Sequence, residues 1–300
     1  MLEVWRMAFL MVGVCFVAAV RGDEAAPARV AEPSEALRDE LQLSPAYHKC
    51  VMLRSFPIVG SDKVSDFAML EAAFLVEAML AERPELLDAL ARNKVRLAVM
   101  ATGELTTDVP EHSDLKPATY WNKRARGLGP TPQRPAVSCA EENLLCHEGD
   151  PYKGENILIH EFAHAVHLMG VNSVDPTFDA RLAAVYKNAM TAGRWKGTYG
   201  ATNKEEYFAE GVQSWFECNR CGTHEHNDVG TRAEVKAYDP ELARLIGEVF
   251  GDRPWVYATP QSRPAPAHLA GLDRTKAPRF AWPKELLEAQ KRERPKDDSK

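Results

Sequence analysis

An H-E-x-x-H pattern, formed by His160, Glu161 and His164 inside the apolar run 157–169, constrains this chain more than any other feature. On an α-helix, residues four apart lie about 40° apart around the axis and about 6 Å along it, so both imidazoles can reach one ion. Glu161 then lies beside the ion, where a general base can accept a proton from water. The alternative is a buried helix whose polar groups bond only to protein. Chance would produce the pattern only about 0.02 times in such a chain, so we favour a metal-binding helix.

A catalytic zinc site needs a third protein ligand and an open position for water. His167 shares a helical face with His160 but lies about 10 Å along the axis, too far away to share the ion. We therefore expect His167 to support a ligand or to lie at the surface. The metzincin arrangement is also absent, because it requires glycine at the position that His167 occupies.

Glu206 is the better candidate for the third ligand. Thr202 and Glu205 fit an S/T-x-x-E capping box, which gives Glu205 a structural role and leaves Glu206 for the metal. Glu210 lies one turn further on the same face, where it can accept the outward N–H of a ligand histidine. The alternative is a solvated helix face. Apolar neighbours such as Phe208 favour a buried helix instead.

These residues together carry a resemblance. H-E-x-x-H, followed by Tyr199 seven positions before Glu206, resembles the catalytic domain of the anthrax lethal factor family of zinc metallopeptidases, whose secreted relatives include the Pro-Pro endopeptidases. The resemblance covers about residues 150–217. It implies a zincin fold with His160, His164 and Glu206 as ligands of Zn²⁺, Glu161 as the base, and Tyr199 as a hydroxyl near the metal. It does not imply a toxin-like role, because the toxin's large non-catalytic domains have no counterpart here.

The first residues predict export. Residues 7–20 are apolar and follow Arg6, which is typical of a secretory signal peptide over 1–22. A retained membrane anchor is the alternative, and we expect no stable membrane span after cleavage. The protein is therefore expected to be secreted or periplasmic.

Export makes disulfide bonds the default expectation. Cys139 and Cys146 bracket a short loop, and we expect them to pair. Cys218 and Cys221 favour a tight disulfide, with a second zinc site or a redox pair as alternatives. Cys50 is the odd cysteine: it is free, pairs with Cys218 or Cys221, or blocks the metal.

The organisation follows from composition and periodicity. Residues 1–22 read as the signal peptide, 23–45 as a linker or short pro-segment, 46–260 as a zinc metallopeptidase catalytic domain, and 261–300 as a Pro-rich and charged tail with a frayed end. The predicted elements are strands at 51–59 and 95–101 and helices at 34–41, 66–80, 84–94, 157–169, 176–192, 204–217 and 240–250, with an irregular stretch at 102–154. Gly170 is expected to cap the metal helix. The predicted fold is α+β and zincin-like, mostly helical with a small sheet.

The expected function is that of an exported zinc endopeptidase acting on a peptide or protein substrate, with Tyr199 donating to the oxyanion. The substrate would lie along the edge of a sheet, and 95–101 is one candidate for a strand of that sheet. His224 and His226 could line the cleft, although solvated loop positions are favoured. With a net charge of −6, no basic face for nucleic acid is evident.

Two other classes remain open. A binding module on a zinc-peptidase scaffold would lose Glu161 or Tyr199, and both are present. A thiol redox protein would use Cys218 and Cys221, but these follow a long helix instead of opening one, which is not the geometry that lowers a thiol pKa. The sequence does not predict the oligomeric state.

Overall fold

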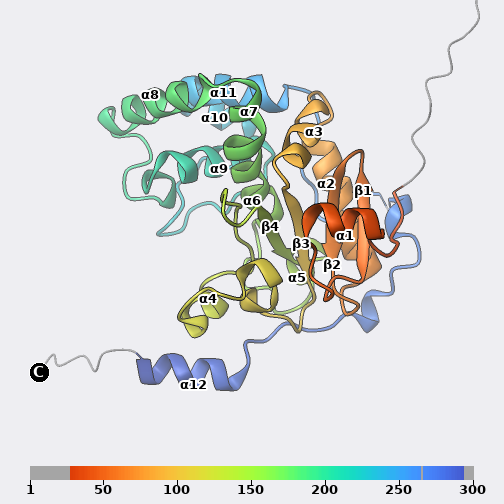
Figure 1. The fold of residues 1–300 in the computed structure, drawn as a ribbon. Helices are drawn as coiled ribbons and strands as arrows, with labels where there is room; N and C mark the ends of the chain where they lie inside the picture. Colours follow the sequence, from red (N-terminus) through yellow and green to blue (C-terminus); the bar gives the residue numbers. More distant parts are fainter. Residues whose placement is uncertain (1–27, 265, 294–300) are drawn as a thin grey trace, which may run out of the picture.

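The computed structural model describes residues 28–264 and 266–293. The predicted signal peptide at 1–22 lies outside these residues. The chain forms an α+β fold, mostly helical with a small sheet, as the sequence predicted (Figure 1). Among the described residues, no helix is both long and apolar enough to cross a membrane.

The sheet has four short strands in the order β1-β2-β3-β4. β1 and β2 form an antiparallel hairpin, whereas β2, β3 and β4 run parallel to one another. The strands are β1 (Lys49–Leu53), β2 (Phe56–Gly60), β3 (Arg96–Met100) and β4 (Ala136–Ala140). The predicted strand 51–59 is thus two strands, separated where Arg54 takes a positive φ of 55°.

Both faces of the sheet are covered, which explains why its strands read as continuous apolar runs. Successive side chains point to opposite faces, so Leu97 and Val99 enter the larger core with the helices behind the sheet, while Ala98 and Met100 face the other side. Helix α1 (Glu35–Leu41) covers that second face and contributes Leu41 to its core (Figure 1).

The predicted strand 95–101 belongs to this sheet as β3, but as an interior strand it does not itself provide an edge. The edge strand next to β3 is β4, which lies within the predicted irregular stretch 102–154. Leu128 runs beside it and forms an isolated antiparallel bridge with Ser138. Five buried residues in a Pro- and Gly-rich context were too short a signal to predict this strand.

Helices surround the sheet in two groups. The first group packs on the sheet or flanks it: α2 (Asp66–Met79), α3 (Glu85–Arg92), α4 (Ala118–Arg124), α5 (Glu141–Leu144) and α6 (Ile157–Ala165). The second group gathers beside α6, away from β1 (Figure 1): α7 (Asn172–Val174), α8 (Phe178–Thr191), α9 (Lys204–Trp215), α10 (Arg232–Tyr238) and α11 (Pro240–Phe250). α9 packs directly against α6, so the two motif segments of the sequence meet in space.

The metal helix does not end at Gly170. It continues from α6 through a π-helical turn, Val166–Val171, into α7. Gly170 lies beside α3, and a Cβ built there would be 3.6 Å from Leu90. Packing against α3 therefore carries the helix past the glycine that predicted its cap.

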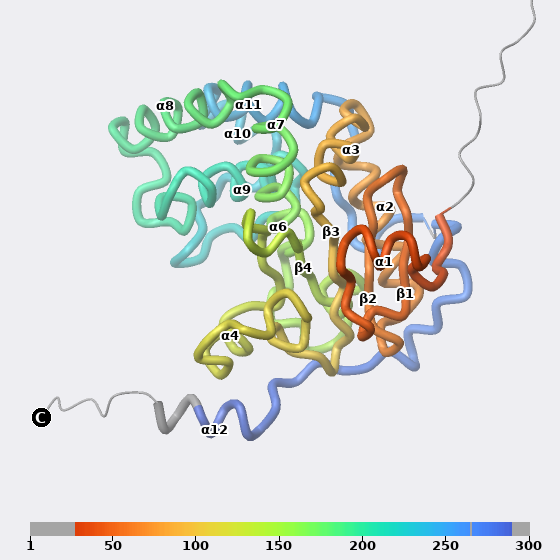
Figure 2. The backbone as a smooth tube through the Cα atoms, in the orientation of Figure 1, coloured from red at the N-terminus to blue at the C-terminus, as the bar shows by residue number. Residues whose placement is uncertain are grey.

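The described parts of the predicted linker and tail, residues 28–45, 261–264 and 266–293, contact the rest of the fold. Ala31 pairs with Cys50 through backbone hydrogen bonds, and Ser34 caps α1. Near the other end, Arg263 and His268 both bind the buried carboxylate of Glu71 on α2. Figure 2 shows the chain then running along the molecule to α12 (Lys284–Glu293), which packs beside α4. The end of the tail, which the sequence predicted to be frayed, is helical as far as residue 293.

The expected disulfides are absent, because all five cysteines in the described part of the chain are free. Cys139 faces the core behind β4. The α5 turn then carries Cys146 elsewhere, with its Sγ 3.9 Å from the Tyr257 hydroxyl. Cys218 is buried after α9, whereas Cys221 is exposed, so these two thiols do not pair either. Cys50 lies on β1, the edge strand farthest from β4, and blocks no metal site.

Candidate metal centre

Helix α6 presents its polar residues to one side. The Asn156 side chain caps the helix by accepting a hydrogen bond from the Ile159 amide at 3.0 Å. Leu158, Ile159 and Phe162 are fully buried in the core. Because these residues occupy the inner face, His160 and Glu161 line a cleft beside α9, and His164 lies next to His160.

Three candidate ligand atoms meet at the end of this face. The Nε2 atoms of His160 and His164 are 3.2 Å apart, and Glu206 Oε2 lies 3.0 Å from the first and 3.4 Å from the second. Two imidazole nitrogens and a carboxylate oxygen this close repel one another unless a proton or a cation lies between them. The residues that the sequence identified as candidate ligands therefore converge on one point.

Helix α9 supplies Glu206 from its first turn, but the predicted cap is wrong. The N-cap residue is Asn203, whose side chain accepts a hydrogen bond from the Glu206 amide at 2.7 Å. Thr202 instead ends η4 (Tyr199–Ala201), a 3₁₀ turn. Glu205 pairs with Lys204 at 3.2 Å and does not complete a capping box.

The protonation of the centre follows from its burial and its pairing. Burial alone would raise the pKa of Glu206, but hydrogen bonds from His160 and His164 hold it well below its usual range. Burial alone would lower the pKa of His160. The bond to Glu206 and the nearby carboxylates raise that pKa to about 10. For Glu206 and His160 the charged forms are therefore favoured, as expected for groups that would otherwise surround a cation.

Gln213 orients the first histidine, a role that the sequence analysis gave to Glu210. His160 Nδ1 lies 2.8 Å from Gln213 Oε1, and Gln213 Nε2 donates to the Asn156 carbonyl at 3.3 Å. That second bond assigns the amide oxygen to His160, so Nδ1 carries the hydrogen and Nε2 faces Glu206. Glu210 remains 3.8 Å from Nδ1, beyond hydrogen-bonding distance.

Glu210 instead binds a different histidine. Its Oε2 lies 3.0 Å from His226 Nδ1 and 3.1 Å from Asn219 Nδ2. His226 is buried and lines the cleft, so the preference for a solvated loop position is wrong for this residue. His224 is exposed, as that preference predicted. The Glu210 bond raises the pKa of His226.

Glu161 and Tyr199 lie beside the three ligand atoms. Glu161 offers an oxygen within 4.8 Å of nitrogens of both His160 and His164. Burial raises the pKa of Glu161, with the two imidazoles opposing the shift. The Tyr199 hydroxyl donates to Glu206 Oε1 at 3.0 Å. Burial also raises the pKa of Tyr199, so its hydroxyl keeps its proton and remains a donor.

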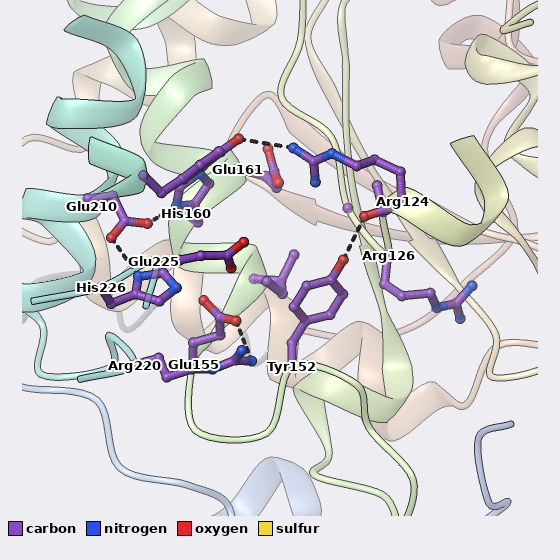
Figure 3. Close-up of a pocket in the computed structure, with 14 residues that line it drawn as sticks. Arg124, Arg126, Tyr152, Glu155, His160, Glu161, Glu210, Arg220, Glu225 and His226 are labelled. Carbon is purple, nitrogen blue, oxygen red and sulfur yellow. Dashed lines mark hydrogen bonds and ion pairs between the residues drawn. The ribbon is translucent and has the colours of Figure 1, made fainter. Parts of the chain in front are cut away.

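These side chains line a cleft of about 400 Å³ (Figure 3). Its opposite wall is the segment from Arg124 to Gly127, which passes very close to α6. A Cβ on Gly127 would lie 2.5 Å from Ile157 Cγ2, and one on Gly129 would lie 2.9 Å from His164 Cβ. Only glycine fits at these two positions, which lets the wall pack directly onto the metal helix.

Two further residues differ from expectation. His167 is fully buried between Phe178 and Phe208, with its Nε2 3.1 Å from Asp179 Oδ1, so it neither supports a ligand nor lies at the surface. Arg124 was not singled out by the sequence, yet its Nη2 donates to the Tyr199 hydroxyl at 3.2 Å. No local pattern distinguishes this arginine from the others in the same loop-rich stretch.

Comparison with protein-family models and with curated proteins gives no match. Among solved structures, the chain is similar to the Pro-Pro endopeptidase PPEP-2 from Paenibacillus alvei, at 20% sequence identity and a TM-score of 0.36. The match covers 64% of this chain and 96% of that one. A likeness this distant assigns no activity, which has to come from the side chains of the cleft.

Proposed function

We propose that this protein is a zinc-dependent endopeptidase. The observation that carries the proposal is the convergence of His160 Nε2, His164 Nε2 and Glu206 Oε2 within 3.4 Å of one another, beside the Glu161 carboxylate. Two imidazoles and a carboxylate are a usual ligand set of catalytic zinc, which keeps a further position open for water or substrate.

The residues present fit this metal. Gln213 holds the Nδ1 hydrogen of His160, which leaves the Nε2 lone pair available for an ion. Bound zinc would supply a Lewis acid that polarises a carbonyl and lowers the pKa of water.

Two side chains, Glu161 and Tyr199, would supply proton transfer and hydrogen bonding to the substrate. In this proposal Glu161 accepts the proton of the attacking water and returns it to the leaving amine. Tyr199 donates its hydroxyl hydrogen to the carbonyl oxygen as negative charge develops there. Its raised pKa supports this role, since the hydroxyl is protonated at neutral pH.

The alternatives find less support. A binding module without activity has no need for a carboxylate beside three ligand atoms, and Glu161 has no ion pair among the described residues. For a thiol redox protein, burial raises the pKa values of both Cys218 and Cys221, which disfavours the reactive thiolate. Export also remains a proposal, because it depends on the apolar run at 7–20.

Two glutamate-to-glutamine variants, one of them a control, test the proposed function. We expect wild-type protein to cut members of a diverse peptide mixture, and a chelator to stop the cleavage. Glu161→Gln should abolish cleavage while about one zinc per chain remains, because this residue is not a ligand. Glu205→Gln, which alters a carboxylate paired with Lys204, is the control and should keep both activity and zinc.

Zinc content by metal analysis and product formation by mass spectrometry are the two readouts. Glu206→Ala should lower zinc occupancy sharply. Cleavage that survives both Glu161→Gln and chelation would refute the proposal, and so would a wild-type protein that binds zinc but cuts no peptide.

A further inference from the structure

Arg124 is the cation of the cleft that has no anionic partner. The other arginines and the non-ligand histidine in the lining are each paired with a carboxylate: Arg126 with Glu142 at 2.5 Å, Arg220 with Glu155 at 2.7 Å, and His226 with Glu210 at 3.0 Å. Within the part of the chain that the structure describes, Arg124 forms no ion pair, and its guanidinium bonds only to the Tyr199 hydroxyl. Its remaining N–H groups are therefore available to a ligand.

The arginine is held in place from both ends. Its backbone carbonyl accepts a hydrogen bond from the Tyr152 hydroxyl at 2.9 Å (Figure 3). Its Nη2 donates to the Tyr199 hydroxyl at 3.2 Å. The neighbouring Lys123 lies 4.4 Å from the ring centre of Trp282, which ties α4 to the C-terminal segment. A guanidinium fixed in this way loses little freedom when it binds an anion.

The position of Arg124 places its guanidinium near the peptide bond that would be cut. Tyr199 bonds to Glu206 at 3.0 Å, so the guanidinium lies only two hydrogen bonds from a candidate metal ligand. A group bound there belongs to the part of a peptide next to the bond being cut. Glu161 and Glu225 also lie in the lining. Neither forms an ion pair with Arg124 among the described residues, and Arg124 acts on Glu161 only through longer-range electrostatic attraction.

We propose that Arg124 binds a carboxylate of the substrate, either an acidic side chain within one or two residues of the scissile bond or a free C-terminus. The planar guanidinium offers two parallel N–H groups, which match a carboxylate and not an amide. This inference rests on the proposed peptidase function. An acidic side chain and a free C-terminus both offer a carboxylate, and the peptides in the experiment distinguish between them.

The experiment uses the zinc-loaded, full-length protein and matched peptides. One pair differs by Asp against Asn at each position flanking the cleavage site, and a second pair differs by a free against an amidated C-terminus. We expect the carboxylate form of one pair to have a kcat/KM about 10- to 100-fold higher, the size expected for a charge-assisted hydrogen bond. A preference in the first pair identifies a side-chain carboxylate, and a preference in the second identifies the terminus.

For the peptide pair that shows the preference, Arg124→Gln should reduce the ratio of the two kcat/KM values to about one. Arg124→Lys should retain part of the preference. Arg134→Gln is the control for loss of one positive charge. Arg134 is paired with Asp114 at 2.7 Å and does not line the cleft, so this variant should keep the ratio. If Arg124→Gln instead lowers kcat equally for both members, the residue only positions Tyr199 and the proposal is overturned.

A binding measurement separates this inference from the proposed function. With Glu161→Gln protein, which should not turn over, titration calorimetry with the same pairs should show tighter binding of the carboxylate form. The double variant Glu161→Gln/Arg124→Gln should lose that difference. Equal dissociation constants for both members in the Glu161→Gln protein would overturn the carboxylate site, even if the peptidase activity is real. A preference that depends on Arg124 would stand even if no peptide is cut.

Discussion

The Tyr199 hydroxyl is the single group whose removal best tests the chemistry of the cleft. It donates to Glu206 Oε1 and accepts from Arg124 Nη2, so it lies between a candidate ligand and the unpaired cation. We expect Tyr199→Phe to lower kcat by roughly 10- to 1,000-fold with KM nearly unchanged, because the hydroxyl would meet the oxyanion only as the carbonyl becomes tetrahedral. Steady-state kinetics and metal analysis are the measurements, and zinc content should not change.

Tyr47→Phe is a suitable control, since it removes another buried hydroxyl, one that donates to Glu111 far from α6. That variant should lose stability and keep its kcat. An unchanged kcat in Tyr199→Phe would rule out the oxyanion role. Loss of zinc would make Tyr199 a support for Glu206 instead.

At the scale of one element, the start of α9 links helix stability to the metal. Asn203 caps the helix through the amide of Glu206, the proposed ligand. Asn203→Ala should therefore cost about 1 kcal/mol of unfolding free energy and also weaken zinc binding. Thr202→Ala should change both quantities little, since its side chain caps no helix. Urea unfolding of the zinc-free protein and a zinc titration measure the two effects, and equal losses in both variants would contradict the observed cap.

At the scale of the whole molecule, three buried histidines make the free energy of unfolding depend on pH. Burial lowers the pKa values of His112, His147 and His167 below the usual 6.5. At these three sites the unfolded chain binds protons that the folded chain does not, so their contribution to stability is full above about pH 6.5 and falls as the pH drops below it. His160 in the metal-free protein acts in the opposite direction: its pKa is raised to about 10, so its contribution is full below about pH 6.5 and falls as the pH rises toward 10. Each such group contributes a slope of at most about 1.4 kcal/mol per pH unit within its window.

His112 is the member best suited to a test. Its Nε2 lies 3.0 Å from Ser138 Oγ on β4, and its Nδ1 has no hydrogen-bond partner among the described residues. Burial outweighs the opposing charge of Glu111 and lowers its pKa. His112→Gln keeps a hydrogen-bonding group but removes the titration. Unfolding free energies between pH 7.5 and 5, measured with chelator present, should fall less steeply in this variant than in wild type. Parallel curves would show that His112 does not carry the dependence.

Local sequence pattern was sufficient to predict several helices and part of the candidate site. The helices at 66–80, 204–217 and 240–250 were predicted within a few residues, because the spacing of apolar side chains is a property of the segment itself. The same holds for His160, Glu161 and His164, whose common face follows from helix geometry alone. The choice of Glu206 over Glu205 was also suggested by the sequence, although the capping box that supported it is not formed.

What the sequence by itself determined is therefore the candidate ligands on each of the two helices and the α+β class, since the spacing of residues along one element is a property of the local sequence. That the two helices meet was decided by the tertiary structure. The tertiary structure alone decided which distant groups join them: Gln213 on His160, Arg124 on Tyr199, and His226 on Glu210. It also decided that Cys139 turns into the core and away from Cys146. These outcomes depend on how α4, α6 and α9 pack against one another. Packing between elements far apart in the chain leaves no periodic trace in any one of them.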